Sequence, residues 1–319
     1  MNGTTRASAH SINHFALNVR DLAEALRFVT AFGLVGRQMT GEIALTTAHD
    51  DHLWARLIGA SATSLGYMSF GCAAGDLDAL RRQALAAGAP MASPAPGAGT
   101  GGFWIADPDG NLLQVKPAVS TQPTSKTALP DGSVPAGVAG VGGRSGAKRV
   151  TPQRLSHVLL FTPDVERMIC FYQRALGLNL SDRSADIIAF MHAPHGCDHH
   201  LIAFAKSSAK GWHHSSWDVP RVEDVGLGAM QMRKAGYGEQ WGVGRHVLGS
   251  NYFDYVRDNG GAWWEYSCHI DYVPAGMQWV AGDHPPEDSF YLWGPDVPPT
   301  FIENTEAVAS NQTSPMDAS

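Results

Sequence analysis

Three residues in the second half of the chain have the types and the surroundings of metal ligands: His157, His214 and Glu265. His157 opens one apolar run, His214 precedes another, and Glu265 follows a pair of tryptophans. Such segments are typical of strands, which hold their side chains in fixed directions. Two imidazoles and one carboxylate form a facial triad that leaves three positions open on a non-haem Fe(II) ion. Those positions accommodate a chelating substrate together with O2.

The chain contains an internal repeat that relates its two halves. Aligning the halves places His14, Tyr67 and Gln114 at the positions of the three candidate ligands. Successive members of this set are about 53 and 47 positions apart, and successive candidate ligands of the second half are about 57 and 51 positions apart. Self-similarity at this scale indicates duplicated structural units. Because Tyr67 and Gln114 are poor ligands for a divalent cation, we predict a metal-free first half in which His14 is a buried strand histidine.

Each half shows the same local order of elements twice. An apolar strand is followed by a helical pattern and then by short strands that Gly and Asp interrupt. Asp at the start of a helix accepts backbone N–H groups, and Gly ends it. The helical patterns begin at Asp21, Asp76, Asp164 and near Val222. We therefore predict an α+β fold with two domains, each built from paired βαβββ modules.

Composition indicates a globular enzyme with two domains. A chain of 319 residues is long enough for two domains, each burying its own core. The net charge of −7 and the lack of a basic stripe argue against a nucleic-acid partner. No apolar stretch is long enough for a membrane span, and the N-terminus lacks a signal-peptide pattern. The four cysteines are scattered, with Cys72 and Cys170 in apolar patterns, so we expect core thiols and a cytoplasmic location.

Four segments follow from these patterns. We assign residues 1–118 to a metal-free N-terminal domain and residues 151–302 to a catalytic metal-binding domain. Residues 119–150 are rich in Gly, Ser, Thr and Pro, which predicts a linker or a mobile surface excursion. An arm that packs on a neighbouring subunit is the alternative. Residues 303–319 are small and polar, which predicts a disordered tail.

These motifs resemble the vicinal oxygen chelate superfamily, and specifically its two-domain type I extradiol catechol dioxygenases. The similarity runs from about Ile12 to Pro298 and is most specific in residues 244–273, GRHVLGSNYFDYVRDNGGAWWEYSCHIDYV. It is strongest to the catechol 2,3-dioxygenase (metapyrocatechase) and homoprotocatechuate 2,3-dioxygenase branches. The resemblance implies that the three candidate ligands hold the metal.

The resemblance also implies roles for three further residues. His199 falls where the family keeps an acid–base histidine, and His246 where a histidine hydrogen-bonds the substrate. Tyr255, ten residues before the ligand Glu, falls where a tyrosine contacts a substrate oxygen. We therefore predict His199, His246 and Tyr255 as catalytic residues.

Other histidines near these motifs are weaker candidates. We expect surface or loop positions for His192, His195 and His200. Successive side chains on a strand point to opposite faces, so we expect His213 to face away from its neighbour His214 and not to be a ligand.

The activity that the resemblance implies is extradiol ring cleavage. Both atoms of O2 enter a catechol, whose ring opens beside the two hydroxyl groups to give a muconic semialdehyde-type product. We expect Fe(II) as the metal, with Mn(II) as the alternative. We expect a catecholic substrate and O2 as partners, no nucleic acid, no membrane, and a homo-oligomer. An isomerase, lyase or hydrolase that uses the metal without O2 is the second interpretation, and a binding protein is the third.

The substrate is only partly indicated by the sequence. The family branch that binds a carboxylated catechol has a basic residue shortly before a W-G-x-P turn. In this chain Ser289, Phe290 and Tyr291 precede Trp293, and no Arg stands there. This favours an uncharged or bulkier aromatic catechol, with residues 284–296 covering the pocket mouth. Five tryptophans either shape an aromatic pocket or face the core: Trp212, Trp217, Trp241, Trp263 and Trp264.

Overall fold

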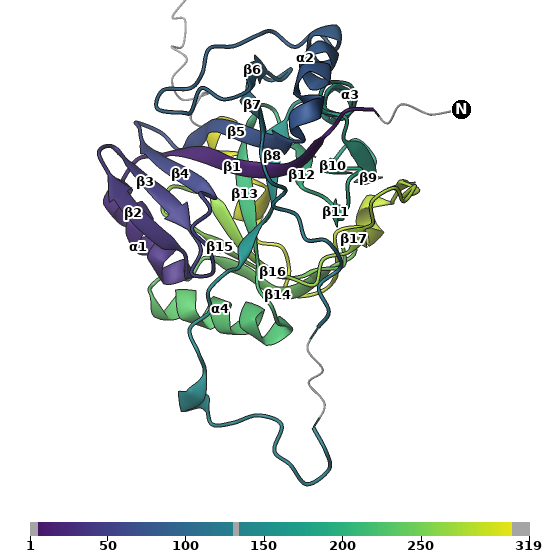
Figure 1. Ribbon diagram of the computed structural model, residues 1–319. Helices are drawn as coiled ribbons and strands as arrows, with labels where there is room; N and C mark the ends of the chain where they lie inside the picture. Colours follow the sequence, from purple (N-terminus) through teal and green to yellow (C-terminus); the bar gives the residue numbers. More distant parts are fainter. Residues whose placement is uncertain (1–5, 130–133, 308–319) are drawn as a thin grey trace, which may run out of the picture.

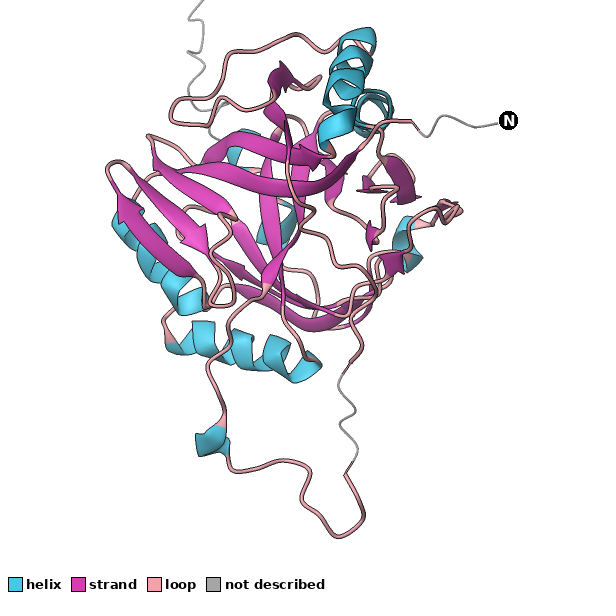
Figure 2. Ribbon diagram, viewed as in Figure 1, coloured by secondary structure: helices cyan, strands magenta, loops and turns pink. Residues whose placement is uncertain are grey.

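Two large twisted sheets, one from each half of the chain, dominate the molecule (Figures 1 and 2). The computed structural model describes residues 6–129 and 134–307. The first half forms a seven-stranded sheet in the order β2-β3-β4-β1-β5-β7-β6. The second half forms a ten-stranded sheet in the order β18-β9-β10-β12-β8-β13-β16-β15-β14-β19. The predicted α+β class is confirmed.

The elements of the first half alternate as the repeat predicts. Their bounds are β1 (Ala9–Val19), α1 (Leu22–Phe32), β2 (Val35–Met39), β3 (Glu42–Thr46), β4 (Ala55–Gly59), β5 (Ser64–Cys72), η1 (Ala74–Asp76), α2 (Leu77–Ala86), β6 (Phe103–Ala106) and β7 (Leu112–Pro117). A short turn of helix, η2 (Arg144–Gly146), lies in the connection between the halves.

The second half contains the same kinds of element with additional short strands. Its helices are α3 (Val165–Leu176), α4 (Val222–Lys234), η3 (Pro286–Asp288) and η4 (Pro299–Ile302). Its strands are β8 (Arg154–Thr162), β9 (Asn179–Ser184), β10 (Ile188–His192), β11 (Cys197–Asp198), β12 (Ile202–Lys206), β13 (Gly211–Asp218), β14 (Gln240–His246), β15 (Tyr252–Arg257), β16 (Trp263–Cys268), β17 (Tyr272–Val273), β18 (Gly282–Asp283) and β19 (Tyr291–Trp293). Strands β11 and β17 pair in a separate small sheet.

The paired modules lie side by side in each sheet. Their first strands are antiparallel neighbours, β1 with β5 and β8 with β13. The second module of the first half departs from βαβββ because only β6 and β7 follow α2 among the described residues. An isolated bridge between Met91 and Ile105 stands where a further strand is expected. The segment contains Pro90, Pro94 and Pro96, which lack the N–H groups that a strand needs.

Two of the predicted helix starts are confirmed in detail. Asp21 accepts hydrogen bonds from two backbone N–H groups of α1, and Asp164 accepts one from α3. Both helices end at a glycine in the left-handed region, Gly33 with φ 102° and Gly177 with φ 71°. Asp76 makes no such cap, since the 3-10 turn η1 leads directly into α2.

The two halves share one hydrophobic core instead of burying separate ones. Helices α1 and α4 pack against each other, as do α2 and α3, and each pair joins the two halves (Figure 1). The ring of Tyr266 stacks on Phe32 at 3.9 Å, and its hydroxyl donates to the Phe32 carbonyl at 2.7 Å. Phe15 contacts Trp212 at 4.9 Å between ring centres. The expectation of a separate core for each half is therefore wrong.

Most of the predicted linker is exposed, whereas the first residues of the predicted tail pack against the second half. Residues 127–129 and 134–148 form an exposed excursion away from the sheets (Figure 1), while Thr121 and Gln122 are anchored by hydrogen bonds to Ile12 and Asp198. The tail was predicted to begin at residue 303, but Asn304 is buried. Its amide donates to the carbonyl of Ala209 at 2.9 Å. The packed chain thus continues to at least residue 307, and residues 308–319 of the predicted tail lie outside the described residues.

Two compositional predictions can be compared with the structure. Among the described residues, no helix has the length and apolar character that crossing a membrane requires. Cys72 is buried, as predicted, whereas Cys170 is exposed on α3. Its helix presents an apolar stripe to the core, and Cys170 lies beside that stripe next to Glu166.

Candidate metal centre

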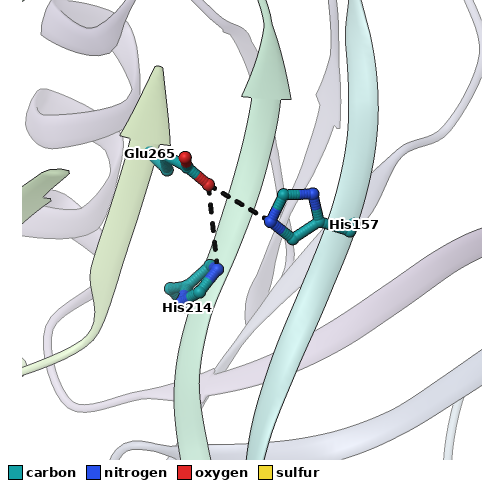
Figure 3. A group of neighbouring side chains, drawn as sticks. All are labelled: His157, His214 and Glu265. Atoms are coloured by element: carbon teal, nitrogen blue, oxygen red, sulfur yellow. Dashed lines mark ion pairs between the residues drawn. The ribbon is translucent and has the colours of Figure 1, made fainter. Parts of the chain in front are cut away.

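The three predicted ligands lie on three adjacent strands of the ten-stranded sheet. His157 on β8 and Glu265 on β16 are both direct neighbours of Ser216 on the central strand β13. His214 precedes Ser216 by two residues, so it lies on the same face of the sheet. Figure 3 shows the three side chains pointing toward one another. The strand register therefore brings together residues that are far apart in the sequence.

The ligand atoms of this group lie close enough together to bind one metal ion. The Nε2 atom of His157 lies 3.2 Å from Oε2 of Glu265, and the Nε2 atom of His214 lies 3.8 Å from the same oxygen (Figure 3). All three side chains are buried, and their ligand atoms lie within 4.8 Å of one another. Neither His214 Nε2 nor Glu265 Oε2 has a hydrogen-bond partner among the described residues. Burying unsatisfied polar atoms is costly, and a divalent cation between them would remove that cost.

Hydrogen bonds behind the ligands fix how they point. Nδ1 of His157 lies 3.2 Å from Oγ of Ser156, which donates to Asp198 at 2.9 Å. The second carboxylate oxygen of Glu265 accepts from the amide of Asn251 at 2.9 Å. Such contacts orient metal ligands and favour the lone pair that faces the metal.

His213 does not lie where strand alternation predicts. Trp212 pairs with Leu160 and His214 with the next residue, Leu159, so His213 is the extra residue of a β-bulge. Both histidines consequently line the same cavity. The two Nδ1 atoms are 2.7 Å apart, and His213 Nε2–H donates to the Phe301 carbonyl at 2.7 Å. Both ring nitrogens of His213 are thus engaged by protein atoms.

A cavity of about 410 Å³ opens directly above the candidate ligands. Its wall includes the imidazoles of His157 and His214 together with His200, His246 and Tyr255. The remainder is mostly apolar, with contributions from Phe161, Ile187, Ile188, Phe190, Phe290 and Phe301. The cavity can therefore hold a ligand that presents polar atoms at one end and an apolar body at the other.

His246 and Tyr255 lie together on this wall, as their predicted roles require. The Nε2 atom of His246 is 3.0 Å from the hydroxyl of Tyr255, and its Nδ1–H donates to the Phe290 carbonyl at 2.9 Å. Burial lowers the pKa of His246 and, with the nearby Glu265, raises that of Tyr255 well above its ordinary value. The neutral imidazole therefore accepts a hydrogen bond from a neutral phenol.

The structure places His200, and not the predicted His199, on the cavity wall. The His200 ring lies 4.1 Å from the ring of His157, while His199 lies behind it and donates to Asp182 at 2.7 Å. Burial and the neighbouring His157 lower the pKa of His200 well below its ordinary value. The histidine that reaches the cavity is thus one residue after the one predicted for acid–base chemistry. Residues 199–201 lie between β11 and β12, where no strand period indicates which side chain faces the ligands.

The other weak histidine candidates lie away from the cavity. His192 is buried and contacts Ser181 Oγ at 2.8 Å, and His195 contacts Ser8 Oγ at 2.6 Å. The expectation of a surface or loop position is therefore wrong for His192, which ends strand β10.

None of the five predicted tryptophans lines the cavity within the part of the chain that the structure describes. Trp217 and Trp264 stack on each other in the shared core at 6.0 Å. Trp241 supports the site from behind, with its ring stacked on Tyr255 at 5.4 Å. Their sequence positions near the ligands reflect packing of the sheet and not a tryptophan-lined pocket.

Asn251 is the polar residue of the site that the sequence reasoning missed. It holds Glu265, and it also lines the cavity. Its backbone carbonyl accepts a hydrogen bond from the His246 N–H at 2.9 Å, which joins the ends of β14 and β15. The only available signal was its place within the segment 244–273, four residues before Tyr255.

Known proteins resemble this chain in sequence and in fold. The family model described as Glyoxalase/Bleomycin resistance protein/Dioxygenase superfamily matches residues 11–115 and 154–266. Metapyrocatechase 2 of Cupriavidus necator is 54% identical over 95% of this chain and 94% of its own length. The Mn(II)-bound glyoxalase from Novosphingobium aromaticivorans superposes with a TM-score of 0.72 at 25% identity, covering 94% of this chain and 99% of its own. A variant of homoprotocatechuate 2,3-dioxygenase from B. fuscum superposes with a TM-score of 0.74 at 19% identity, covering 95% and 84%.

Proposed function

We propose that this chain, which belongs to the Glyoxalase/Bleomycin resistance protein/Dioxygenase superfamily and within it to the metapyrocatechase family, cleaves catechols with O2 beside their hydroxyl groups. It is an extradiol ring-cleaving dioxygenase. The observation that carries this function is the convergence of His157, His214, His200, His246 and Tyr255 on one mostly apolar cavity, with Glu265 completing the ligand set beside the first two.

The metal proposed for the three ligands is Fe(II). Two neutral imidazoles and one carboxylate suit this ion, and the unsatisfied atoms of His214 and Glu265 are placed to bind it. Bound there, Fe(II) would act as a redox-active Lewis acid toward the catechol and O2. Mn(II) remains the alternative, since the same donor set accepts it and the related glyoxalase contains Mn(II).

His200 is proposed to move the proton in ring cleavage. Its depressed pKa keeps the imidazole neutral, so it can accept a proton from a catechol hydroxyl and return it to an oxygen later in the reaction. Its contact with His157 places it next to the metal site without making it a ligand. We therefore transfer to His200 the role predicted for its neighbour His199.

Tyr255 and His246 are proposed to hold the substrate oxygen. Tyr255 lies 5.1 Å from His214 between ring centres, so its hydroxyl is close to where a chelated catechol oxygen would lie. His246 keeps that hydroxyl in place, and the carbonyl of Phe290 keeps His246 in place. Fixed dipoles of this kind need no reorganisation during the reaction.

The preferred substrate is proposed to be a catechol with an apolar substituent. Phe161, Ile187, Ile188 and Phe290 contribute apolar side chains to the cavity wall. Lys206 is the only Lys or Arg among the described lining residues, and it pairs with Asp186. An apolar substituent would gain from burial here, whereas a carboxylate would lack a free cationic partner.

The test is O2 consumption after anaerobic loading with Fe(II) and, in parallel, with Mn(II). We expect O2 uptake in equal amount to a yellow ring-opened product, with alkyl- or aryl-substituted catechols ahead of a carboxymethyl catechol in kcat/KM. The His200→Gln variant should keep its metal and lose roughly 10²–10⁴-fold in kcat, as for a lost general acid–base group. The His199→Asn variant is the adjacent comparison.

Each outcome separates one part of the proposal. Metal binding without O2 uptake would favour an O2-independent reaction like that of a glyoxalase. A preference for the carboxymethyl catechol would contradict the proposed substrate class. Wild-type kcat in His200→Gln would remove the proton-transfer role from that residue.

A further inference from the structure

His199 joins His200 to a carboxylate on the far side from the cavity. The Nε2 atom of His199 lies 2.7 Å from Oδ2 of Asp182, and its Nδ1 atom lies 3.0 Å from Nδ1 of His200. Both histidines are buried, and Asp182 is largely buried behind them. The three side chains thus form a continuous path of hydrogen bonds that ends at the cavity wall.

Asp182 is held as a carboxylate with a fixed orientation. Burial raises its pKa, but hydrogen bonds with His199, the Gly282 N–H and His284 outweigh burial and lower it. Its Oδ1 atom accepts from Gly282 N–H at 2.7 Å and contacts His284 Nε2 at 3.1 Å. Oδ2 is therefore the oxygen left for His199, and an ionised carboxylate can only accept.

With one hydrogen on each ring, these contacts allow a single arrangement of the ring hydrogens. Because Oδ2 of Asp182 accepts, Nε2 of His199 carries a hydrogen, and Nδ1 of a neutral His199 is then an acceptor. Nδ1 of His200 must donate to it, which leaves the Nε2 atom of His200 with a free lone pair. That atom has no hydrogen-bond partner among the described residues, and His200 lines the cavity.

We propose that Asp182, acting through His199, is a positioning residue that fixes His200 in the tautomer whose Nε2 accepts a proton from the substrate. This inference rests on the proposed function, because it concerns the residue to which proton transfer is assigned. A carboxylate that holds a histidine in one tautomer and one orientation is known to raise the efficiency of general bases.

The same arrangement occurs a second time in the site. His213 Nε2–H donates to the Phe301 carbonyl, and Nδ1 of His213 lies 2.7 Å from Nδ1 of His214. The same reasoning leaves His214 Nε2 with a free lone pair toward the metal site. Two histidine pairs, each anchored on an oxygen acceptor, thus present an unprotonated Nε2 to one cavity.

Asp182→Asn is the substitution that tests the tautomer. Gly282 N–H still requires an acceptor, so the amide oxygen of Asn takes the Oδ1 position and its NH2 group faces His199. His199 Nε2 must then accept, so the His199 hydrogen moves to Nδ1. The His200 hydrogen consequently moves from Nδ1 to Nε2. We expect unchanged metal content and KM, and a kcat lower by on the order of 10²-fold or more, as for a misplaced general base.

A double variant provides the rescue that a merely structural role would not show. In Asp182→Asn/His199→Asn, the amide at position 199 can turn its oxygen toward Nδ1 of His200. The position of the hydrogen on the His200 ring then no longer depends on the residue at position 182. We expect its kcat to return to that of His199→Asn alone, whereas independent structural damage would add the two losses. His192→Asn is the matched control, because His192 is equally buried nearby but bonds Ser181; its kcat should equal that of the wild type.

A second comparison holds even if Asp182→Asn fails to fold. Asn and Leu have the same branched shape, but only Asn offers His200 an acceptor, so His199→Asn should exceed His199→Leu in kcat by roughly 10-fold or more. Equal kcat for these two, or wild-type kcat in Asp182→Asn, would overturn the inference while leaving ring cleavage intact. A wild-type protein that consumes no O2 with any catechol would instead refute the proposed function itself.

Discussion

The two halves of the molecule place their central polar residues on the same backbone pattern but satisfy them differently. In the first half, Ser69 on β5 is the direct neighbour of His14 on β1 and of Gln114 on β7, and Tyr67 precedes it by two residues. Ser216 has the same relation to the three ligands of the second half. The register is thus common to both halves, and only the side chains differ.

In the first half these side chains satisfy one another. His14 Nε2 lies 3.0 Å from the hydroxyl of Tyr67, which also accepts from Arg56 at 3.2 Å, and Ser69 Oγ donates to Gln114 at 2.9 Å. In the second half the equivalent serine oxygen, His214 Nε2 and Glu265 Oε2 have no hydrogen-bond partner among the described residues. The comparison teaches that a binding site here consists of polar atoms which the fold leaves unsatisfied.

The largest effect is expected from removing a ligand in the second half. His157→Ala, His214→Ala and Glu265→Ala should each abolish stoichiometric metal and activity, because water cannot replace a protein ligand without a large loss of affinity. Metal analysis of the purified variants, together with O2 uptake, measures both. His14→Ala is the matched control and should keep the metal. Metal loss in that variant would mean that the first half also binds an ion.

A smaller effect is expected from removing a hydrogen bond behind a ligand. Asn251→Ala takes away the amide that donates to Glu265, which should weaken metal affinity by about 10–100-fold, as is typical of such contacts. Competition with a chelator measures the affinity. Asn13→Ala is the control, since Asn13 contacts Nδ1 of His14 in the first half at 2.9 Å. Equal affinity in both variants would contradict the orienting role of Asn251.

A pH effect should distinguish the buried histidine of the first half. Burial, followed by the charges of Lys116, His52 and Arg56, lowers the pKa of His14 to about 3, against 6.5 for an ordinary histidine. Between these values the unfolded chain binds a proton that the folded chain does not, so the free energy of unfolding falls as the pH falls through this window. In His14→Gln the free energy of unfolding should fall less over this window, because unfolding of the variant takes up one proton fewer. Urea unfolding at pH 7 and pH 4.5 measures the difference, and identical falls would refute it.

The smallest effect is expected from restoring the ligand types in the first half. Tyr67→His with Gln114→Glu supplies two imidazoles and a carboxylate, yet we expect metal analysis to find one ion per chain. The guanidinium of Arg56 lies beside position 67 and would repel a divalent cation. Two ions per chain would show that ligand types alone decide which half binds metal.

Much of the site could be predicted because the repeat carries information on strand register. Aligning His14 with His157 requires their neighbours to align as well, and the facial triad then follows from residue type. The helix starts at Asp21 and Asp164 were predictable because their capping bonds are local. Predictions of this kind depend on short-range geometry or on regular strand spacing.

The failures occurred where that spacing breaks. His213 faces the cavity because a bulge adds a residue to β13, and the side chain at the cavity wall is that of His200 and not His199, both of which lie outside the strands. A period of two residues cannot be applied at either place. Contacts between residues far apart in the sequence were equally hidden: the pattern does not reveal that Tyr266 packs on Phe32, or that Asn304 packs beside Ala209.

The contact between His213 and Phe301 is made by a backbone carbonyl, with consequences for how the protein can vary. Any residue at position 301 presents the same oxygen, so this hydrogen bond depends on the path of the chain, whereas the buried Phe301 ring is constrained separately by its place in the cavity wall. An insertion or deletion between β19 and η4 would move that oxygen and release His213, even though every ligand stayed in place. Variation in length before Phe301, more than variation in the residue at position 301, is therefore what the hydrogen bond from His213 cannot tolerate.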